Sequence, residues 1–188
     1  MSKNILHIKN MVCDRCLASV QNILTEQKLA YTAISLGRID LESEISEAAL
    51  ENLKNSLESA GFELVLERNE QIVTSIKSIV IEQVYERGEA DSRKLSEILS
   101  DRLHYDYSHL TGIFSRAEGQ SIQSFQNKIR IERIKEFLEY GELGMNEIAD
   151  RLGFSSAAYL STFFKKETGL SPSRFKSDSS ERQSLDKL

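Results

Sequence analysis

The sequence predicts an α+β protein in which an amino-terminal sandwich of strands and helices is followed by an all-helical domain. Three observations indicate this division. Strand-like and helix-like segments alternate through about the first seventy residues, and apolar residues then recur at the three- and four-residue spacing of amphipathic helices. One helical pattern also occurs twice in the second part of the chain. With 188 residues, each domain is large enough to have a core of its own.

The amino-terminal elements follow the order β-α-β-β-α-β. A strand at residues 4–10 leads into an amphipathic helix, and two β-rich runs, AYTAIS and RIDLE, come next. Leu36 and Gly37 separate these runs, which predicts a hairpin. Ser46 caps a second helix, and FELVLE is the fourth strand. This order predicts a ferredoxin-like sandwich with both helices on one face of an antiparallel sheet.

Cys13 and Cys16 lie in MVCDRC, at the junction of the first strand and the first helix. Thiolates prefer soft ions, so the pair is a candidate site for Cu(I) or, less favoured, Zn(II). Two thiolates leave a tetrahedral zinc ion short of ligands, whereas Cu(I) accepts low coordination more readily. We also expect the positive end of the helix to lower the thiol pKa values. A second chain that completes the coordination shell would give a metal-driven homodimer.

Other interpretations of the cysteine pair stay open, because a lone C-x-x-C can also be a redox pair or two incidental thiols. The three histidines, His7, His104 and His109, lack ligand spacing to a cysteine or to one another. We interpret them as structural or solvent-facing. Met11 is interpreted as an apolar anchor of the loop and not as a ligand.

A helix is predicted at residues 71–87, between the sandwich and the repeated pattern. Its apolar side is formed by Ile72, Ile76, Ile79, Val80 and Val84. One proline and no low-complexity run argue against a floppy tether. We expect this helix to connect the domains and to belong to the carboxy-terminal one.

The most informative pattern is MNEIADRLGFSSAAYLSTFFKKETGLSPSRF at residues 145–175. Apolar residues share one side of a first helix at residues 147–152, and Gly153 can adopt the positive φ that reverses the chain. Ser155 or Ser156 caps a second helix, which has a polar outer face. A helix, a sharp turn and a second helix of this kind form the element that proteins place in the major groove of DNA.

The same pattern occurs about fifty residues earlier, so the unit is duplicated. The residues Ile98, Leu110, Phe114, Gly119, Ser121 and Phe125 correspond to Ile148, Leu160, Phe164, Gly169, Ser171 and Phe175. The tripeptide DRL at residues 101–103 recurs at residues 150–152, which places a one-residue length difference in the turn. A helix at residues 121–140, with the apolar stripe Ile122, Phe125, Ile129, Ile134, Phe137 and Leu138, joins the copies and should fix them relative to each other.

Residues 71–176, with this pair of units and the ending GFSSAAYLSTFFKKETGLSPSRF, resemble the AraC-type DNA-binding domain. The resemblance implies two recognition helices, residues 106–118 and 156–168, that enter successive major-groove segments on one face of the duplex. The side chains expected at base edges are Ser108, Thr111 and Gly112 in the first unit and Ala157, Ala158 and Thr162 in the second, where Ser156 is the first residue of the helix. We call the two helix-turn-helix units the readers. The basic residues in or beside them are Arg116, Lys128, Arg130, Arg151, Lys165, Lys166, Arg174 and Lys176.

The base-facing positions depart from that family, whose members often have arginine, glutamine or tryptophan there. Bidentate pairing with bases needs long polar side chains, so we expect modest hydrogen-bond specificity, supplemented by methyl contacts to thymine. Residues 91–176 have 13 basic and 12 acidic side chains, whereas residues 1–90 have 9 and 14. An ordinary protein surface also gives such a contrast. The placement of the basic residues around the readers nevertheless favours salt-dependent binding to DNA.

Residues 1–67, with MVCDRC at the front and AGFELV at the end, resemble the heavy-metal-associated domain of copper chaperones and metal-pumping ATPases. That family usually has glycine and threonine around the methionine, whereas this chain has Asn10 and Val12. The resemblance implies that Cys13 and Cys16 bind the metal.

These features predict a heavy-metal-associated-like domain at residues 1–68, a DNA-binding domain at residues 69–176 and a flexible tail at residues 177–188. The predicted function is a transcription regulator that binds double-stranded DNA and is controlled by or linked to a soft metal ion such as Cu(I). The alternative is a metallochaperone-like or thiol-redox protein whose helical half binds a protein partner. No nucleophile–base pair, phosphate loop or paired-carboxylate motif appears, so no catalytic role is predicted. Without a signal peptide or a long apolar run, the chain is expected to be cytoplasmic.

Overall fold

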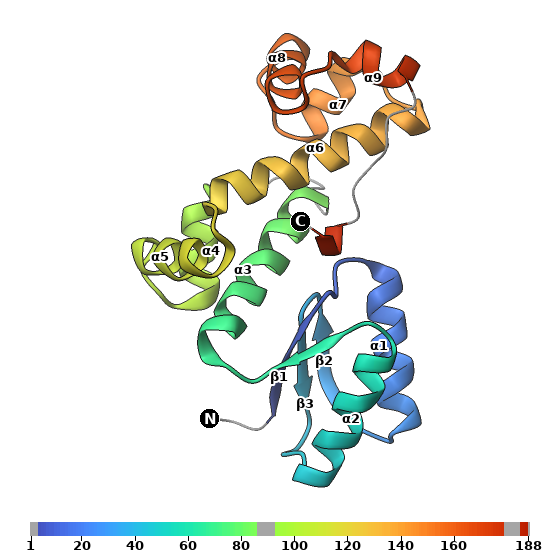
Figure 1. Ribbon diagram of the computed structural model, residues 1–188, viewed down its shortest axis with the longest axis vertical. Coiled ribbons are helices and arrows are strands. Elements are labelled where there is room, and N and C mark those ends of the chain that lie inside the picture. Colours follow the sequence, from blue (N-terminus) through green and yellow to red (C-terminus); the bar gives the residue numbers. More distant parts are fainter. Residues whose placement is uncertain (1–3, 86–92, 179–184, 188) are drawn as a thin grey trace. The chain divides into compact units, whose positions relative to one another are not determined.

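The computed structural model describes residues 4–85, 93–178 and 185–187 (Figure 1). Its amino-terminal elements are β1 (Ile5–Lys9), α1 (Asp14–Glu26), β2 (Tyr31–Ser35), β3 (Arg38–Leu41), α2 (Glu47–Ser59) and β4 (Glu63–Val65). The helices α3 (Arg68–Tyr85), α4 (Leu95–Leu103), α5 (Tyr107–Glu118), α6 (Ile122–Tyr140), α7 (Met145–Arg151), α8 (Ala157–Thr168) and α9 (Pro172–Asp178) follow, with a 3-10 turn at Leu185–Lys187. The predicted α+β class, with a small antiparallel sheet and a mostly helical carboxy-terminal part, is confirmed.

The sheet has the strand order β2-β3-β1-β4, and each neighbouring pair is antiparallel. In the centre, Leu6 pairs with Ile39 of β3, and Ile8 pairs with Leu64 of β4. The turn between β2 and β3 is the predicted Leu36-Gly37, where Gly37 has a φ of 71°. The elements therefore follow the predicted β-α-β-β-α-β order, while assignment to the ferredoxin-like class stays a prediction.

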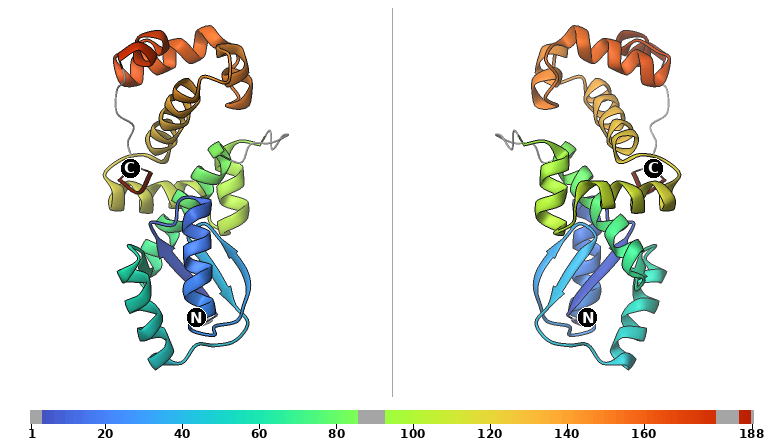
Figure 2. Two further views of the ribbon diagram at one scale, coloured as in Figure 1. Left: turned by 90° about the vertical axis from the view of Figure 1, so that its right-hand side faces the viewer. Right: turned by 90° about the vertical axis from the view of Figure 1, so that its left-hand side faces the viewer.

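The helices α1 and α2 cover one face of the sheet (Figures 1 and 2). Leu6, Ile8 and Ile39 of the strands are buried there. They belong to one core with Val20, Leu24, Leu53 and Leu57 of the helices. The predicted cap of α2 is present, because Ala49 N donates to Ser46 Oγ at 3.2 Å. Burial of these alternating strand residues against two amphipathic helices supplies the main hydrophobic stabilisation of this part.

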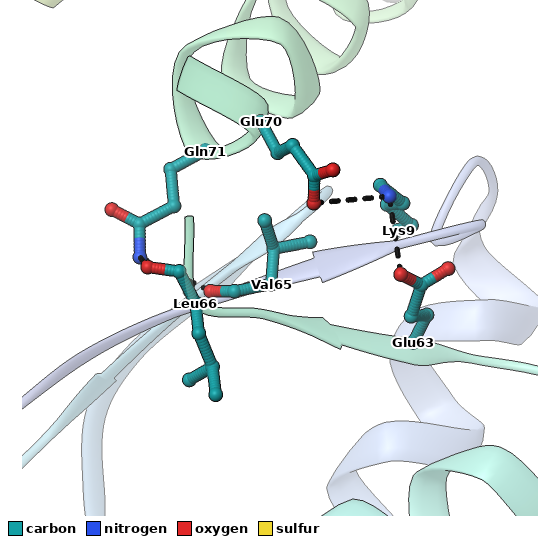
Figure 3. A network of polar contacts seen from close by, with 6 residues as sticks. All are labelled: Lys9, Glu63, Val65, Leu66, Glu70 and Gln71. Atoms are coloured by element: carbon teal, nitrogen blue, oxygen red, sulfur yellow. Dashed lines mark hydrogen bonds and ion pairs between the residues drawn. The ribbon is translucent and has the colours of Figure 1, made fainter. Parts of the chain in front are cut away.

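The helix α3 packs against the second face of the same sheet. Ser75 Oγ lies 3.3 Å from His7 Nδ1 of β1, and Lys9 Nζ lies 3.4 Å from Glu70 Oε2 and 3.1 Å from Glu63 Oε1. Gln71 Nε2 also donates to the carbonyl of Val65 (Figure 3).

The β2–β3 turn also lies close to α3. A Cβ at Gly37 would overlap Ser78 Oγ and come within 3.3 Å of Thr74 Cγ2. Glycine therefore meets two requirements here, a positive φ and a close approach to a helix.

This packing changes the interpretation of the connector. The helix begins at Arg68, three residues before the predicted start, and ends at Tyr85, while residue 87 lies outside the described residues. Assignment of α3 to the carboxy-terminal domain stays a prediction. Its residues as far as Ile79 fall in a compact unit with the sheet, because Ile72, Val73 and Ile76 are buried while polar neighbours contact the sheet.

The chain divides into two compact units. The first compact unit comprises Met1–Ile79 and Leu95–Gly119, and the second compact unit comprises Val80–Lys94 and Gln120–Leu188. The first compact unit thus contains the sheet together with α4 and α5, and the second compact unit contains α6 to α9. The predicted domain boundaries at residues 68 and 176 stay predictions, as does the expectation that the connecting helix fixes the two readers.

The helix α6 begins one residue after the predicted start, ends at the predicted Tyr140 and has the predicted apolar stripe. Ser121 caps it by accepting a hydrogen bond from Ser124 N at 3.0 Å. The whole stripe is buried: Ile122, Phe125, Ile129, Ile134, Phe137 and Leu138. Along the described residues no helix is long and apolar enough to cross a bilayer.

The predicted flexible tail at residues 177–188 falls largely outside the described residues, which exclude 179–184 and 188. Its first two residues continue α9 to Asp178, and Leu185–Lys187 form a 3-10 turn.

Candidate nucleic-acid interface

The second helix-turn-helix unit consists of α7, a short turn and α8. Gly153 takes a φ of 65°, and Phe154 N donates to Ala149 O at 2.8 Å, so the turn closes the end of α7. Of the two predicted caps of α8, Ser156 is the one used, because its Oγ accepts from Tyr159 N at 3.1 Å. The helix therefore begins at a fixed residue, which sets the direction in which each later side chain points.

Arg130 of α6 contacts this turn through its guanidinium group. Its Nη2 donates to Leu152 O at 2.7 Å, and its guanidinium carbon lies 4.0 Å from the centre of the Phe154 ring. Phe154 also contacts Phe163, with ring centres 5.2 Å apart. Arg130 is one of the predicted DNA contacts. The structure shows a role inside the unit, and a contact with DNA by this side chain stays a prediction.

One face of α8 is exposed along its length. It carries Ala158, Tyr159, Thr162, Lys165 and Lys166, whereas Leu160 and Phe164 are buried on the opposite side. Thr162 Oγ1 donates to the Ala158 carbonyl at 3.0 Å, which occupies its hydrogen atom within the helix. Ser156 is exposed although its hydroxyl caps the helix, and Ala157 is half-buried at the edge of this face.

The first unit, α4 and α5, presents an equivalent but less exposed face. Ser108 and Arg116 are exposed, whereas Thr111 and Gly112 are half-buried. Thr111 Oγ1 donates to the Ser108 carbonyl at 2.8 Å. The predicted base-facing residues thus share the outer side of α5, and Arg116 is the basic residue among them.

The predicted length difference between the two units lies in the turn. Between the residue of positive φ and the start of the second helix, the first unit has Tyr105 and Asp106, and the second has Phe154, Ser155 and Ser156. In the first unit His104 takes the positive φ, at 57°, where the second unit has Gly153.

The remaining predicted basic contacts are exposed: Lys128 of α6, Arg151 of α7, and Arg174 and Lys176 of α9. Arg151, Lys165 and Lys166 lie in the second helix-turn-helix unit, and Arg174 and Lys176 lie on α9, which directly follows it. Exposed positive charge is therefore concentrated in α7 to α9, whereas the outer face of α5 carries Arg116.

Two exposed residues on the outer faces of α8 and α5 are not among the predicted DNA contacts: Tyr159 and His109. They stand at equivalent positions, fifty residues apart. Tyr159 precedes Thr162 by three residues and Lys166 by seven, which is the spacing of one helix face. That spacing is the signal in the sequence that places Tyr159 on the same face of α8 as Thr162 and Lys166.

The two thiols are close together at the start of α1. Cys13 Sγ and Cys16 Sγ lie 3.2 Å apart, and Cys16 Sγ lies 3.7 Å from the Asn10 carbonyl. Cys13 is exposed and Cys16 is half-buried. Burial raises the pKa of the Cys16 thiol above its ordinary value, so the expectation of a lowered pKa was wrong for this residue.

The other candidate ligands are elsewhere. Within the described residues no group of three histidine, cysteine or acidic side chains is arranged to hold a metal ion. Met11 is buried in the core, as an apolar anchor should be. His7 contacts Ser75, and its pKa is lowered by burial and by the Arg38 charge, with Asp40 opposing. His104 and His109 are exposed, as predicted for solvent-facing residues.

Comparison with known proteins bears on the helical part. A family model described as "Helix-turn-helix domain" matches residues 99–178. The chain is 30% identical over 80 residues to the bifunctional transcriptional activator/DNA repair enzyme AdaA of Bacillus subtilis, covering 43% of this chain and 38% of the relative. It is 29% identical over 106 residues to the Msm operon regulatory protein of Streptococcus mutans, covering 56% of this chain and 36% of that protein. The chain thus spans well under half the length of these relatives.

Among solved structures, the C-terminal domain of AraT, a response regulator from Geobacillus stearothermophilus, is similar. It superposes with a TM-score of 0.51 at 27% identity and covers 63% of this chain and 92% of that domain. The family model matches the helical part alone, and the resemblance of residues 1–67 to heavy-metal-associated domains is left without support.

Proposed function

We propose that this chain, whose carboxy-terminal part is an AraC-type helix-turn-helix DNA-binding domain, is a regulator of transcription. The observation that carries the proposal is the repeated helix–turn–helix arrangement with an exposed polar face on α8. The family match over residues 99–178 supports it, as do relatives named as regulators. The alternative, a metallochaperone-like or thiol-redox protein with a protein partner for its helical half, predicts no affinity for duplex DNA.

In this proposal α5 and α8 are the recognition helices. Base edges would be contacted from Ser108, Thr111 and Gly112 in the first unit, and from Ser156, Ala157, Ala158 and Thr162 in the second. Phosphate contacts would come from Arg116, Lys128, Lys165 and Lys166. Short side chains at the base-facing positions favour methyl contacts and DNA shape over bidentate hydrogen bonds.

The direct test is a titration of labelled duplex DNA with the full chain at several salt concentrations. Replacing Lys165 and Lys166 by alanine should weaken binding to every sequence and lower the salt slope by roughly one for each lost phosphate contact. Lys54→Ala, on α2 of the acidic amino-terminal part, is the matched control and should bind like the parent. No binding of duplex DNA by the parent at low salt would favour the alternative function.

Sequence discrimination offers a second test. Thr162 lies at the centre of the exposed face of α8. Thr162→Arg should change the preferred sites, by about 1–3 kcal/mol where a guanine lies within reach. Selection from a randomised duplex pool measures this change, and identical preferences for parent and variant would show that α8 does not enter the groove as proposed.

We further propose that Cys13 and Cys16 bind one soft metal ion, with Cu(I) favoured over Zn(II). The 3.2 Å separation of the sulfur atoms and the exposure of Cys13 support a two-thiolate site. The raised pKa of Cys16 means that the metal must displace a more tightly held proton, which weakens binding as the pH falls. A second chain that supplies further ligands would link metal binding to homodimer formation.

Control of DNA binding by this metal requires a path from the cysteines to a reader. The first compact unit supports such a path, since α3 contacts the sheet through His7 and Lys9 and contacts the first reader through two further pairs. Arg68 Nη2 donates to Tyr105 Oη at 2.7 Å, and Lys77 Nζ lies 2.7 Å from Glu118 Oε2. The metal can control DNA binding only if its own affinity differs between the DNA-competent and the DNA-incompetent state of the protein.

The experiment is a Cu(I) titration under reducing conditions against a competing chelator, for the parent and for Cys13→Ser/Cys16→Ser. Metal uptake by the parent alone supports the site, and equal uptake by both proteins removes it. A change of DNA affinity on metal loading in the parent alone supports control. Uptake without that change keeps the site and removes the control.

A further inference from the structure

Tyr159 is an exposed aromatic side chain on the proposed DNA-reading face. It is 57% exposed, in a unit where the other large residues of α8 pack inward. Its neighbours on this face are Ala158 and Thr162, which are much smaller. The phenol is therefore the largest group that this part of the helix presents to a partner.

The ring of Tyr159 is held in place by the turn. Its centre lies 5.9 Å from that of Phe154, with the planes tilted by 59°. Phe154 is itself buried and lies against the guanidinium of Arg130. Because the ring rests on this fixed stack, little rotational freedom is lost when its hydroxyl meets a partner. Within the described part of the chain, the structure assigns that hydroxyl no hydrogen bond.

The position of Tyr159 on the helix indicates which DNA group it meets. Seven residues separate it from Lys166, so the two side chains lie on nearly the same line along α8. Ala158 and Thr162 lie closer to the middle of the exposed face. A lysine is a point charge suited to phosphate, which places this line at the backbone side of the groove.

The first unit repeats the arrangement with other residues. His109 stands at the position equivalent to Tyr159, is exposed, and stacks on Tyr105 at a centre distance of 5.3 Å. Both units thus place a planar ring with a polar hydrogen-bonding tip on a turn aromatic. The position of the hydrogen-bond donor is the same in both units, although the residue differs. This agrees with a contact to phosphate, because phosphate oxygens are the same at every base pair.

We propose that Tyr159 donates a hydrogen bond from its hydroxyl to a phosphate oxygen of the duplex and so positions α8 in the groove. The inference rests on the proposed function, since it needs the chain to bind DNA. It assigns Tyr159 a positioning role that is independent of base sequence. A neutral phenol displaces no counterion, so its contribution differs from that of a lysine in one measurable respect: the salt slope is unaffected.

The test is an anisotropy titration with mixed-sequence duplexes of about 30 base pairs, roughly three helical turns. Tyr159→Phe keeps the ring on Phe154 and removes only the hydroxyl. We expect its affinity to fall roughly ten-fold on every duplex, with an unchanged slope of log K against log salt. Tyr140→Phe, at an exposed tyrosine at the end of α6, is the matched control and should bind like the parent. Equal thermal melting of the parent and both variants shows that the fold is kept.

Two results would overturn the proposal. Parent-like affinity of Tyr159→Phe would show that the hydroxyl makes no contact, and loss on some sequences only would show that it meets a base and not a phosphate. Failure of the proposed function gives a different result, because the parent itself would then bind no duplex or would bind it with no dependence on Lys165 and Lys166.

Discussion

The two helix-turn-helix units share a core but differ in what supports them. Phe114 and Phe164 stand at equivalent positions and both are fully buried. The first unit contacts α3 through the pairs Arg68–Tyr105 and Lys77–Glu118 and falls in one compact unit with the sheet, whereas the second packs with α6 and α9. The two units thus share the same local pattern of buried residues but pack against different parts of the chain. The comparison teaches that duplication preserves the buried spacing of a motif, while the surrounding chain decides what the motif is coupled to.

The turns differ in the same way. In the second unit a glycine takes the positive φ and an arginine lies over the turn phenylalanine. In the first unit a histidine takes the positive φ and Arg68 donates to the tyrosine hydroxyl. The turn of the first unit is the more strained of the two, because the left-handed region is unfavourable for His104, which has a Cβ.

The largest expected effect comes from emptying the two equivalent core positions. Phe114→Ala and Phe164→Ala should each destabilise their own unit by about 3–5 kcal/mol, through lost burial and a residual cavity. Hydrogen exchange locates the damage. We expect Phe114→Ala to speed exchange in the sheet as well as in α4 and α5, and Phe164→Ala to leave the sheet protected. Sheet amides that stay protected in Phe114→Ala would show that the sheet and the first reader unfold separately.

A smaller effect is expected from the arginines at the two turns. Arg130→Ala removes a charge-assisted hydrogen bond and a cation–π contact, and should cost about 2–3 kcal/mol. Arg130→Lys keeps the charge but loses the planar contact, so it should recover only part of the stability. Arg68→Ala, whose bond to Tyr105 is exposed, should cost less than about 1 kcal/mol. Denaturant unfolding of the three variants measures these values, and equal losses for Arg130→Ala and Arg68→Ala would contradict the comparison.

The residues of positive φ should respond in opposite directions. Gly153→Ala places a Cβ in the left-handed region and should destabilise the protein by about 1 kcal/mol. His104→Gly relieves the same strain and should be neutral or stabilising by up to about 1 kcal/mol. Thermal melts of the two variants beside the parent give the sign. Destabilisation by His104→Gly would mean that its side-chain contacts outweigh the backbone strain.

The smallest effect concerns the contact between α3 and the sheet. Burial and Arg38 lower the pKa of His7 below 6.5. The unfolded chain therefore binds more protons in acid, and stability should fall as the pH drops from about 6.5 through the lowered pKa. Because His7 is only partly buried, we expect a loss below about 1 kcal/mol. Urea unfolding across this pH range should show the loss in the parent and a smaller one in His7→Gln; identical profiles would assign the pH dependence to other groups.

Much of the helical part could be predicted because its signals are local. The spacing of Leu160 and Phe164, the cap at Ser156 and the reversal at Gly153 each depend on a few consecutive residues. The repeat added a second instance of the same pattern, and its length difference lies in the turn. Because His104 and Gly153 are equivalent, the predicted pairing of Ile98 with Ile148 was wrong, and buried Leu99 is the equivalent of Ile148. The base and phosphate contacts drawn from this pattern stay predictions.

The sequence by itself determined the order of strands and helices, the buried faces and the caps, because backbone periodicity and local hydrogen bonds need no distant partner. Only the tertiary structure decided that α3 covers the second face of the sheet, that Arg130 lies over Phe154, and that burial raises the pKa of Cys16. Each of these depends on which distant residues meet. Burial and electrostatic environment are properties of that packing, so a residue's neighbours in the chain do not fix them.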